Sequence, residues 1–260
     1  MPEAGKVNAA TVAAYTLTSF PHLKLALVVG VCGAVPYYPV KDVGNGKSFK
    51  EVILGDVILS TGVVQYDLGW RYDERLETKD TLRAALGRPT QKLRAHMTMM
   101  NGIHARKRLQ AAIKDFLAKL QQEPELAARY PGVAKDKLIQ YCEGSKDIPS
   151  GYHLILRDRL ALNQQDPIPD TAVHFGLVAS GDSVIMSAQT RNRIQKEKGV
   201  IAFEMESAGV WDVLPCIVIK GVSDYADAYK DKSWQRYASA TAAACMKAFL
   251  ATWGPSTLGA

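Results

Sequence analysis

The chain has 260 residues, 47% of them hydrophobic, which is enough for one large α/β domain with a sizeable core. Lys and Arg number 32 against 26 Asp and Glu, and the excess is confined to residues 70–160, which hold 18 basic and 11 acidic side chains, a net charge of +7. No apolar run reaches the roughly 18 residues of a membrane span, no secretory signal opens the chain, and the four cysteines form no C-x-x-C pair, so we expect a cytoplasmic protein with reduced thiols and no membrane partner.

The first predicted elements are a helix and three strands. Small and apolar residues cluster on one side of Val7–Phe20, and Pro21 ends this helix. The apolar run Leu23–Gly30 predicts a buried strand that enters a glycine-rich turn at Gly30–Pro36. A polar surface loop is expected at residues 40–49. The next two predicted strands are Val52–Ser60 and Gly62–Asp67.

From about residue 71 to 170 the sequence changes to long, charged and mainly helical segments, including Leu109–Leu120, which are separated by prolines. We interpret this part as a basic helical insertion into the core and not as a separate fold. The core pattern then resumes. Its predicted elements are a strand at Val173–Asp182, a helix at Arg191–Lys198, a strand at Val200–Phe203, a helix at Ser207–Val213, a strand at Cys216–Val222 and a last helix at about Trp234–Trp253.

Strands that alternate with helices and are apolar throughout predict a mostly parallel sheet that is covered on both faces. The expected fold class is α/β, a three-layer sandwich with a mostly parallel mixed central sheet, formed by residues 1–260 as a single domain. In such sheets the reactive groups gather at the carboxyl ends of the strands. Four segments at strand ends are therefore expected to converge: Gly30–Ala34, Ser180–Ile185, Glu204–Glu206 and Ser223–Asp227.

Glu204, Met205 and Glu206 directly follow a buried strand, where a carboxylate is unfavourable unless it has hydrogen-bonding partners. The two adjacent hydroxyls of a ribose are suitable partners, because one carboxylate can accept a charge-assisted hydrogen bond from each. Glu206 is the candidate for this role, with Glu204 as a supporting or rim group and Met205 as an apolar surface beside the sugar. Taken alone, the motif is equally typical of a solvated turn.

Asp224 ends a buried strand and follows Ser223, a position at which a carboxyl group can be kept available as an acid. Departure of a purine base needs such an acid, because protonation at N7 lets the base leave as a neutral molecule while the ribosyl ring becomes oxocarbenium-like. Asp227 is more typical of a structural residue that accepts hydrogen bonds from loop amides.

Short motifs occur here in the order found in the purine and uridine phosphorylase superfamily, which includes methylthioadenosine/S-adenosylhomocysteine nucleosidase. The chain resembles most closely the nucleoside-phosphorylase-type domains of fungal immune-type receptors, over most of residues 4–71 and 172–253. The motifs that carry the resemblance are Gly5–Ala10 (GKVNAA), Val29–Val35 (VGVCGAV), Leu54–Val57 (LGDV), Gly176–Asp182 (GLVASGD), Phe203–Glu206 (FEME) and Val222–Asp224 (VSD).

By position, the resemblance implies that Glu206 binds the ribose hydroxyls, Met205 lies beside the sugar, and Asp224 is the acid at the purine N7. It also places Val184 and Ile185 beside the base. Relatives usually have an aromatic ring where Val184 stands, so base stacking is expected to be weaker here. The resemblance further implies a homo-oligomer that needs no metal or cofactor. The remaining expected substrate-binding residues are Glu204, Ser223, Cys32 and Gly33.

Two departures from the superfamily bear on the nucleophile. Phosphorylases have a serine after the first glycine of the turn and often an arginine shortly before it, both for phosphate, whereas this chain has Val31 and the apolar run Leu25–Val29. Water is therefore favoured over phosphate. Relatives also carry strands before the Gly5–Val7 segment that hold the first phosphate loop or the water-activating glutamate, and these are apparently absent here. No residue is accordingly assigned as the general base.

The basic segment suggests an anionic part of the substrate, since some superfamily members cleave the glycosidic bond of ATP. Its candidate residues are Arg71, Arg106, Lys107 and Arg108, although a solvated helical surface explains the charge better. Nucleic-acid binding is not expected, because these residues lack interleaved aromatic side chains.

The expected function is cleavage of the N-ribosidic bond of a purine nucleoside or nucleotide of the adenosine, inosine, methylthioadenosine or ATP type. Hydrolysis with release of the free base is favoured. Phosphorolysis by a true nucleoside phosphorylase and a non-catalytic nucleoside-sensing or interaction domain remain alternatives.

Overall fold

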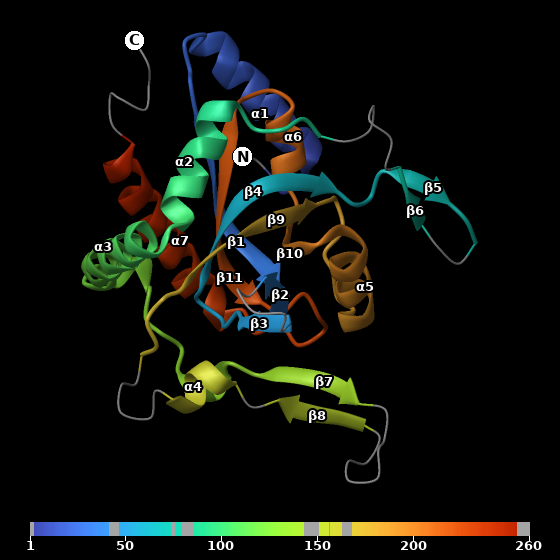
Figure 1. The fold of residues 1–260 in the computed structure, drawn as a ribbon, viewed down its shortest axis with the longest axis vertical. Helices are drawn as coiled ribbons and strands as arrows, with labels where there is room; N and C mark the ends of the chain where they lie inside the picture. Colours follow the sequence, from blue (N-terminus) through green and yellow to red (C-terminus); the bar gives the residue numbers. More distant parts are fainter. Residues whose placement is uncertain are drawn as a thin grey trace.

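A computed structural model of the chain describes residues 3–41, 47–73, 76–79, 86–142, 151–155, 157–162 and 168–253 (Figure 1). Its helices are α1 (Lys6–Ser19), α2 (Gln91–Asn101), α3 (Ile103–Gln121), α4 (Asp158–Leu162), α5 (Ala188–Lys198), α6 (Ser207–Trp211) and α7 (Ser233–Thr252). Its strands are β1 (Ala26–Ala34), β2 (Tyr37–Lys41), β3 (Lys47–Glu51), β4 (Val57–Gln65), β5 (Gly69–Arg71), β6 (Leu76–Thr78), β7 (Leu138–Cys142), β8 (Gly151–Ile155), β9 (Val173–Ser180), β10 (Val200–Glu204) and β11 (Cys216–Asp224).

The central sheet has five strands in the order β1-β10-β9-β4-β11, and β11 pairs again with β1, so the sheet closes into a barrel. Three of its pairings are parallel, while β1–β10 and β4–β11 are antiparallel. The predicted mixed, mostly parallel sheet is thus present, but the three-layer sandwich is not confirmed. Register shifts at Cys32/Gly33, Ser60/Gly62 and Val200/Ala202 bend the strands as bulges do, which accounts for the closure.

Two strand predictions are corrected by this sheet. The segment Gly30–Ala34 is not a turn, because β1 continues through it to Ala34. Gly33 marks the register shift at Cys32/Gly33 instead. The two strands expected on either side of Thr61 are one strand, β4, with a register shift at Ser60/Gly62. The loop expected at 40–49 is wrong for its described residues, since residues 40 and 41 belong to β2 and residues 47–49 to β3, while residues 42–46 lie outside the described part.

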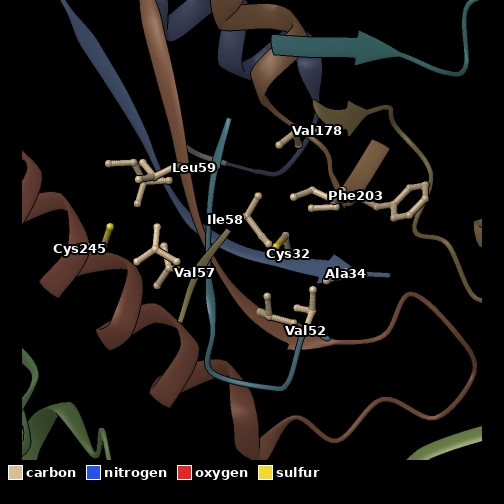
Figure 2. Packing of buried hydrophobic residues seen from close by; sticks show 14 of the residues in the cluster. Cys32, Ala34, Val52, Val57, Ile58, Leu59, Val178, Phe203 and Cys245 are labelled. Carbon is tan, nitrogen blue, oxygen red and sulfur yellow. The ribbon is translucent and has the colours of Figure 1, made fainter. Parts of the chain in front are cut away.

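Small residues allow the helices to lie very close to each other and to the sheet. Gly209 of α6 has no Cβ, and one placed there would lie 2.0 Å from the Lys6 carbonyl oxygen of α1. A Cβ on Gly221 of β11 would lie 1.9 Å from the Ala238 carbonyl oxygen, so the alanine-rich face of α7 fits directly against the strand. Figure 2 shows Cys245 of α7 on the side of that helix that faces Val57 and the core.

The prediction of buried thiols is confirmed for Cys32, Cys216 and Cys245, which are buried and free. Cys142 ends β7, and its side chain lies outside the described part. Within the described residues, none of the helices has the length and apolarity needed to cross a membrane.

The segment from 71 to 170 is less helical than expected, because it contains the hairpin β7–β8 as well as α2, α3 and α4. Two of its arginines are directed into the core. Arg159 forms an ion pair with the buried Asp56, with Nη2 to Oδ1 at 3.0 Å. The guanidinium of Arg157 lies between the rings of Tyr37 and Tyr225, 4.8 and 4.9 Å from their centroids. Part of the basic charge therefore fastens this segment to the core.

His96 of α2 is buried against α7, and its burial makes the stability of the folded protein depend on pH. The imidazole is only 4% exposed, and it contacts the rings of Phe249 and Trp253 edge-on at centroid distances of 5.1 and 4.8 Å. Neither ring nitrogen has a hydrogen-bonding partner among the described residues. Burial therefore lowers the pKa of His96, so the folded protein resists its protonation.

We expect the free energy of unfolding to fall as the pH drops below about 6.5, because the unfolded chain then binds a proton that the folded chain excludes. In His96→Leu this part of the pH dependence should disappear. Urea unfolding between pH 5 and 8 measures it, with the exposed His22→Leu as the matched control. An unchanged slope in His96→Leu would show that the imidazole is not the group responsible.

Candidate active site

A cavity of about 360 Å³ opens where the four predicted segments meet. It is lined from β1, from the loop after β9, from the end of β10 and from the end of β11, which agrees with the expected convergence. All nine residues named from the sequence line it, and their individual roles stay predictions. They are Cys32, Gly33, Val184, Ile185, Glu204, Met205, Glu206, Ser223 and Asp224. The other lining residues are Ala4, Val31, Ser183, Phe203, Ala226, Lys230 and Gln235.

The strand order explains how residues distant in sequence reach one cavity. β1 lies between β10 and β11, and Gly33 is the register partner of Phe203 on one side and of Asp224 on the other. Two strand spacings of about 4.8 Å each separate β10 from β11 along the curved wall of the barrel, so their backbones lie less than about 10 Å apart in a straight line. One small ligand can therefore contact residues at the ends of both strands.

Glu204 and Glu206 share one buried lysine, Lys220 of β11. Its Nζ lies 3.2 Å from Oε2 of Glu204 and 2.9 Å from Oε2 of Glu206. Glu204 also accepts hydrogen bonds from the backbone N–H groups of Glu206 at 3.2 Å and Ser207 at 3.1 Å. Glu204 thus binds backbone N–H groups and stabilises the turn after β10, whereas Glu206 is the more exposed of the two carboxylates.

The pKa values of Glu204 and Lys220 reflect two opposed effects, burial of each side chain and its contacts with groups of opposite charge. Burial alone raises the pKa of Glu204, but Lys220 and the hydrogen bonds from Ser207 and Ser180 hold it below its ordinary value. Burial lowers the pKa of Lys220, and the two glutamates more than compensate, so it is raised. Lys220 is therefore a charged ammonium between two carboxylates at neutral pH.

Asp224 is held by three donors. Its Oδ1 accepts hydrogen bonds from the Ala226 backbone N–H at 2.9 Å and from Lys230 Nζ at 2.5 Å, and its Oδ2 lies 3.3 Å from the Ser223 hydroxyl. Gly33 makes this arrangement possible, because a Cβ there would lie only 2.7 Å from Oδ1. The neighbouring Cys32 is no candidate nucleophile, since burial raises the pKa of its thiol.

The loop after β9 carries the residues expected beside the base. Val184 is 57% exposed and Ile185 is buried, so Val184 presents an open apolar surface at the cavity. The two residues that follow β4 hold this loop in place. The Tyr66 hydroxyl donates to the Ser183 carbonyl at 2.5 Å, and Asp67 accepts from the Asp182 backbone N–H at 2.8 Å.

Two residues of the site could not be assigned from the sequence alone, Lys220 and Lys230. Lys220 is the one charged residue within the apolar strand β11 before Asp224, which was a signal of a buried ion pair. Lys230 lies in a polar loop and gave no such signal.

Three of the four basic candidates of the segment 71–170 are absent from the described lining of the cavity. Arg106, Lys107 and Arg108 belong to α3, which supplies no described lining residue, and the side chain of Arg71 lies outside the described part. In the part of the chain that is described, no three His, Cys, Asp or Glu side chains are grouped so that they could share a metal ion.

In comparison with known proteins, residues 1–251 match a family model that is described as the Phosphorylase superfamily. A nucleotide-binding leucine-rich repeat (NLR)-like protein of Hyaloscypha variabilis is 30% identical over 268 residues, covering 99% of this chain and 24% of that protein. A 5′-methylthioadenosine/S-adenosylhomocysteine nucleosidase of Mycobacterium bovis is 30% identical over 83 residues, covering 30% of this chain and 32% of that protein.

The structure of a mutant Helicobacter pylori MTAN with 5′-methylthioadenosine in its active site is similar in fold, with a TM-score of 0.54 at 18% identity. The match covers 96% of this chain and 78% of that one. The chain therefore spans about a quarter of the NLR-like relative and about a third of the nucleosidase of Mycobacterium bovis.

Proposed function

The chain belongs to the phosphorylase superfamily, and from this we propose that it cleaves the N-ribosidic bond of a purine nucleoside or nucleotide. One observation carries the proposal: Glu206, in the turn after β10, and Asp224, at the end of β11, line the same cavity, and these two strands lie on either side of β1. Its volume of about 360 Å³ lies within the range of small-molecule sites.

In the proposed reaction, Glu206 accepts hydrogen bonds from the two ribose hydroxyls, and its contact with Lys220 Nζ at 2.9 Å holds the carboxylate in place. Asp224 delivers a proton to N7 of the purine. The electron pair of the C1′–N9 bond then leaves with a neutral base, while positive charge develops on the ribosyl ring beside the Glu206 carboxylate. Ser223 and the Ala226 backbone N–H orient Asp224 for this step.

Hydrolysis is favoured over phosphorolysis. Val31 and Cys32 give the β1 side of the cavity an apolar and thiol lining, which offers no positive charge or hydroxyl to a phosphate ion. The similarity to a nucleosidase supports the same choice. The acidic residues of the described lining are Glu204, Glu206 and Asp224, and none is assigned as the base that activates water. That the protein forms a homo-oligomer and binds no nucleic acid stays a prediction.

The proposal is tested by incubating the protein with adenosine, inosine, methylthioadenosine or ATP, with and without inorganic phosphate, and separating the products by chromatography. Release of free base without phosphate is the expected result. Release that requires phosphate would show phosphorolysis. Binding of a nucleoside with no release of base would identify a sensing domain and contradict the proposed activity.

Glu206→Gln is expected to weaken both binding and turnover, since the amide removes the charge that strengthens the bonds to the ribose hydroxyls. A charge-assisted hydrogen bond contributes about 1.5–3 kcal/mol, so KM should rise roughly 10- to 100-fold. Steady-state kinetics on the fastest nucleoside measures the effect. Glu197→Gln on α5, an exposed position, is the matched control. Wild-type KM in Glu206→Gln would exclude the proposed role.

A further inference from the structure

Lys230 is the cation that contacts Asp224 within the described part of the site. Its Nζ donates to Asp224 Oδ1 at 2.5 Å, and its side chain is 24% exposed at the cavity. Lys220, the other lysine of the site, is bonded to Glu204 and Glu206 instead. Asp224 and Lys230 thus form a pair that is separate from the group formed by Lys220, Glu204 and Glu206.

The loop between β11 and α7 brings Lys230 back into contact with Asp224, and several contacts hold this loop. Arg191 of α5, which is buried, donates to the Tyr225 carbonyl at 2.7 Å, and Asp227 Oδ1 accepts from the Tyr229 backbone N–H at 2.9 Å. Ala226 has a φ of 50°, in the left-handed region that a non-glycine residue adopts only under constraint. These contacts constrain the backbone of the loop that leads to Lys230.

The hydrogen bonds to Asp224 bear on the source of the proton that the leaving base receives. Its Oδ1 receives an ammonium and a backbone N–H, which is how a carboxylate is bound, and a carboxylate has no proton of its own to give to a leaving base. The ammonium of Lys230 carries three. Because Lys230 also reaches solvent, it can recover a proton after each turnover.

We propose that Lys230 supplies the proton that Asp224 passes to the base, an inference that rests on the proposed function. The Nζ–H bond of Lys230 breaks as an O–H bond forms on Asp224. The carboxyl group gives its proton to N7 as the C1′–N9 bond breaks, and the electron pair leaves with the neutral base. Water adds to C1′ and releases one proton to solvent, from which the amine of Lys230 is protonated again.

Two substitutions separate the supply of a proton from a purely electrostatic role. Lys230→Met removes both the charge and the proton. Lys230→Arg keeps a positive charge beside Asp224, but a guanidinium does not give up a proton in proteins. The matched control is Lys232→Met, which makes the same change at an exposed position outside the cavity lining. Thermal unfolding of each variant reports whether it is folded.

With the nucleoside that the wild type cleaves fastest, both Lys230 variants should lose on the order of 10² in kcat while KM stays within about threefold. With 4-nitrophenyl β-ribofuranoside, whose phenolate leaves without a proton, both should stay within about threefold of the wild type. Lys232→Met should match the wild type on both substrates. Glu206→Gln, by contrast, should be impaired on both, because the sugar is common to them.

Normal turnover of the purine nucleoside by Lys230→Arg would overturn the inference, since charge alone would then suffice. Equal losses on both substrates would also overturn it, because they would show a structural role. If the wild type cleaves the nucleoside but not the nitrophenyl riboside, the kcat of Lys230→Arg on the nucleoside is the deciding measurement: a loss supports the inference and a normal value overturns it. If the wild type releases no base at all, the proposed function fails first and the inference falls with it.

Discussion

Asp224→Asn is expected to lower turnover by on the order of 10² or more while KM changes by less than about threefold. Asparagine has nearly the same shape as aspartate, so its side-chain oxygen can still accept from the Ala226 backbone N–H, as Asp224 Oδ1 does at 2.9 Å. What is lost is the carboxyl group that passes a proton to the base in the proposed reaction. The loss should therefore fall on kcat, because in that reaction Asp224 acts when the C1′–N9 bond breaks and contributes little to holding the sugar.

Rates of base release under single-turnover conditions measure this effect without interference from product release, and calorimetric titration with the nucleoside measures binding separately. Asp212→Asn makes the same substitution at an exposed residue outside the active-site cavity and should be indistinguishable from the wild type. Turnover by Asp224→Asn within about threefold of the wild type would mean that another group protonates the base.

The strands of the core could be predicted because their apolar, β-branched runs are continuous. β9, β10 and β11 all lie within one or two residues of the expected ranges. The prediction of a turn at Gly30–Ala34 is wrong for a physical reason. A glycine marks either a turn or a place where another group approaches closely, and the sequence does not distinguish the two. At Gly33 the approaching group is the Asp224 carboxylate, and the chain stays extended.

The cavity was predictable from the rule that strand ends gather ligands, but the partners in its ion pairs were not. The contact of Lys220 with Glu204 depends on β10 and β11 both lying next to β1, which is far from them in the chain. Closure of the barrel likewise depends on bulges such as the one at Ser60/Gly62. Such long-range register is set by the whole sheet, so no local pattern reveals it.

Lys220→Met is expected to lower the free energy of unfolding by about 3–5 kcal/mol, since removing one partner of a buried ion pair leaves the other charge uncompensated. Lys220 and Glu204 are both almost fully buried, and methionine fills a similar volume without offering a donor to either glutamate. Urea unfolding at pH 7 measures the change. Lys196→Met, an exposed lysine of α5, should stay within about 0.5 kcal/mol of the wild type.

The difference between wild type and Lys220→Met should shrink on acidification. In the wild type the pKa of Glu204 lies below its ordinary value, so its stabilising charge is present above about pH 4.3 and is lost as the pH falls through the folded value. In the variant, burial without the lysine raises that pKa, and a proton on Glu204 then relieves the unpaired charge. The double variant Glu204→Gln/Lys220→Met should recover part of the loss at pH 7, because it buries no unpaired charge at position 204. A double variant no more stable than Lys220→Met would show that the lysine stabilises the fold by packing and not by pairing with Glu204.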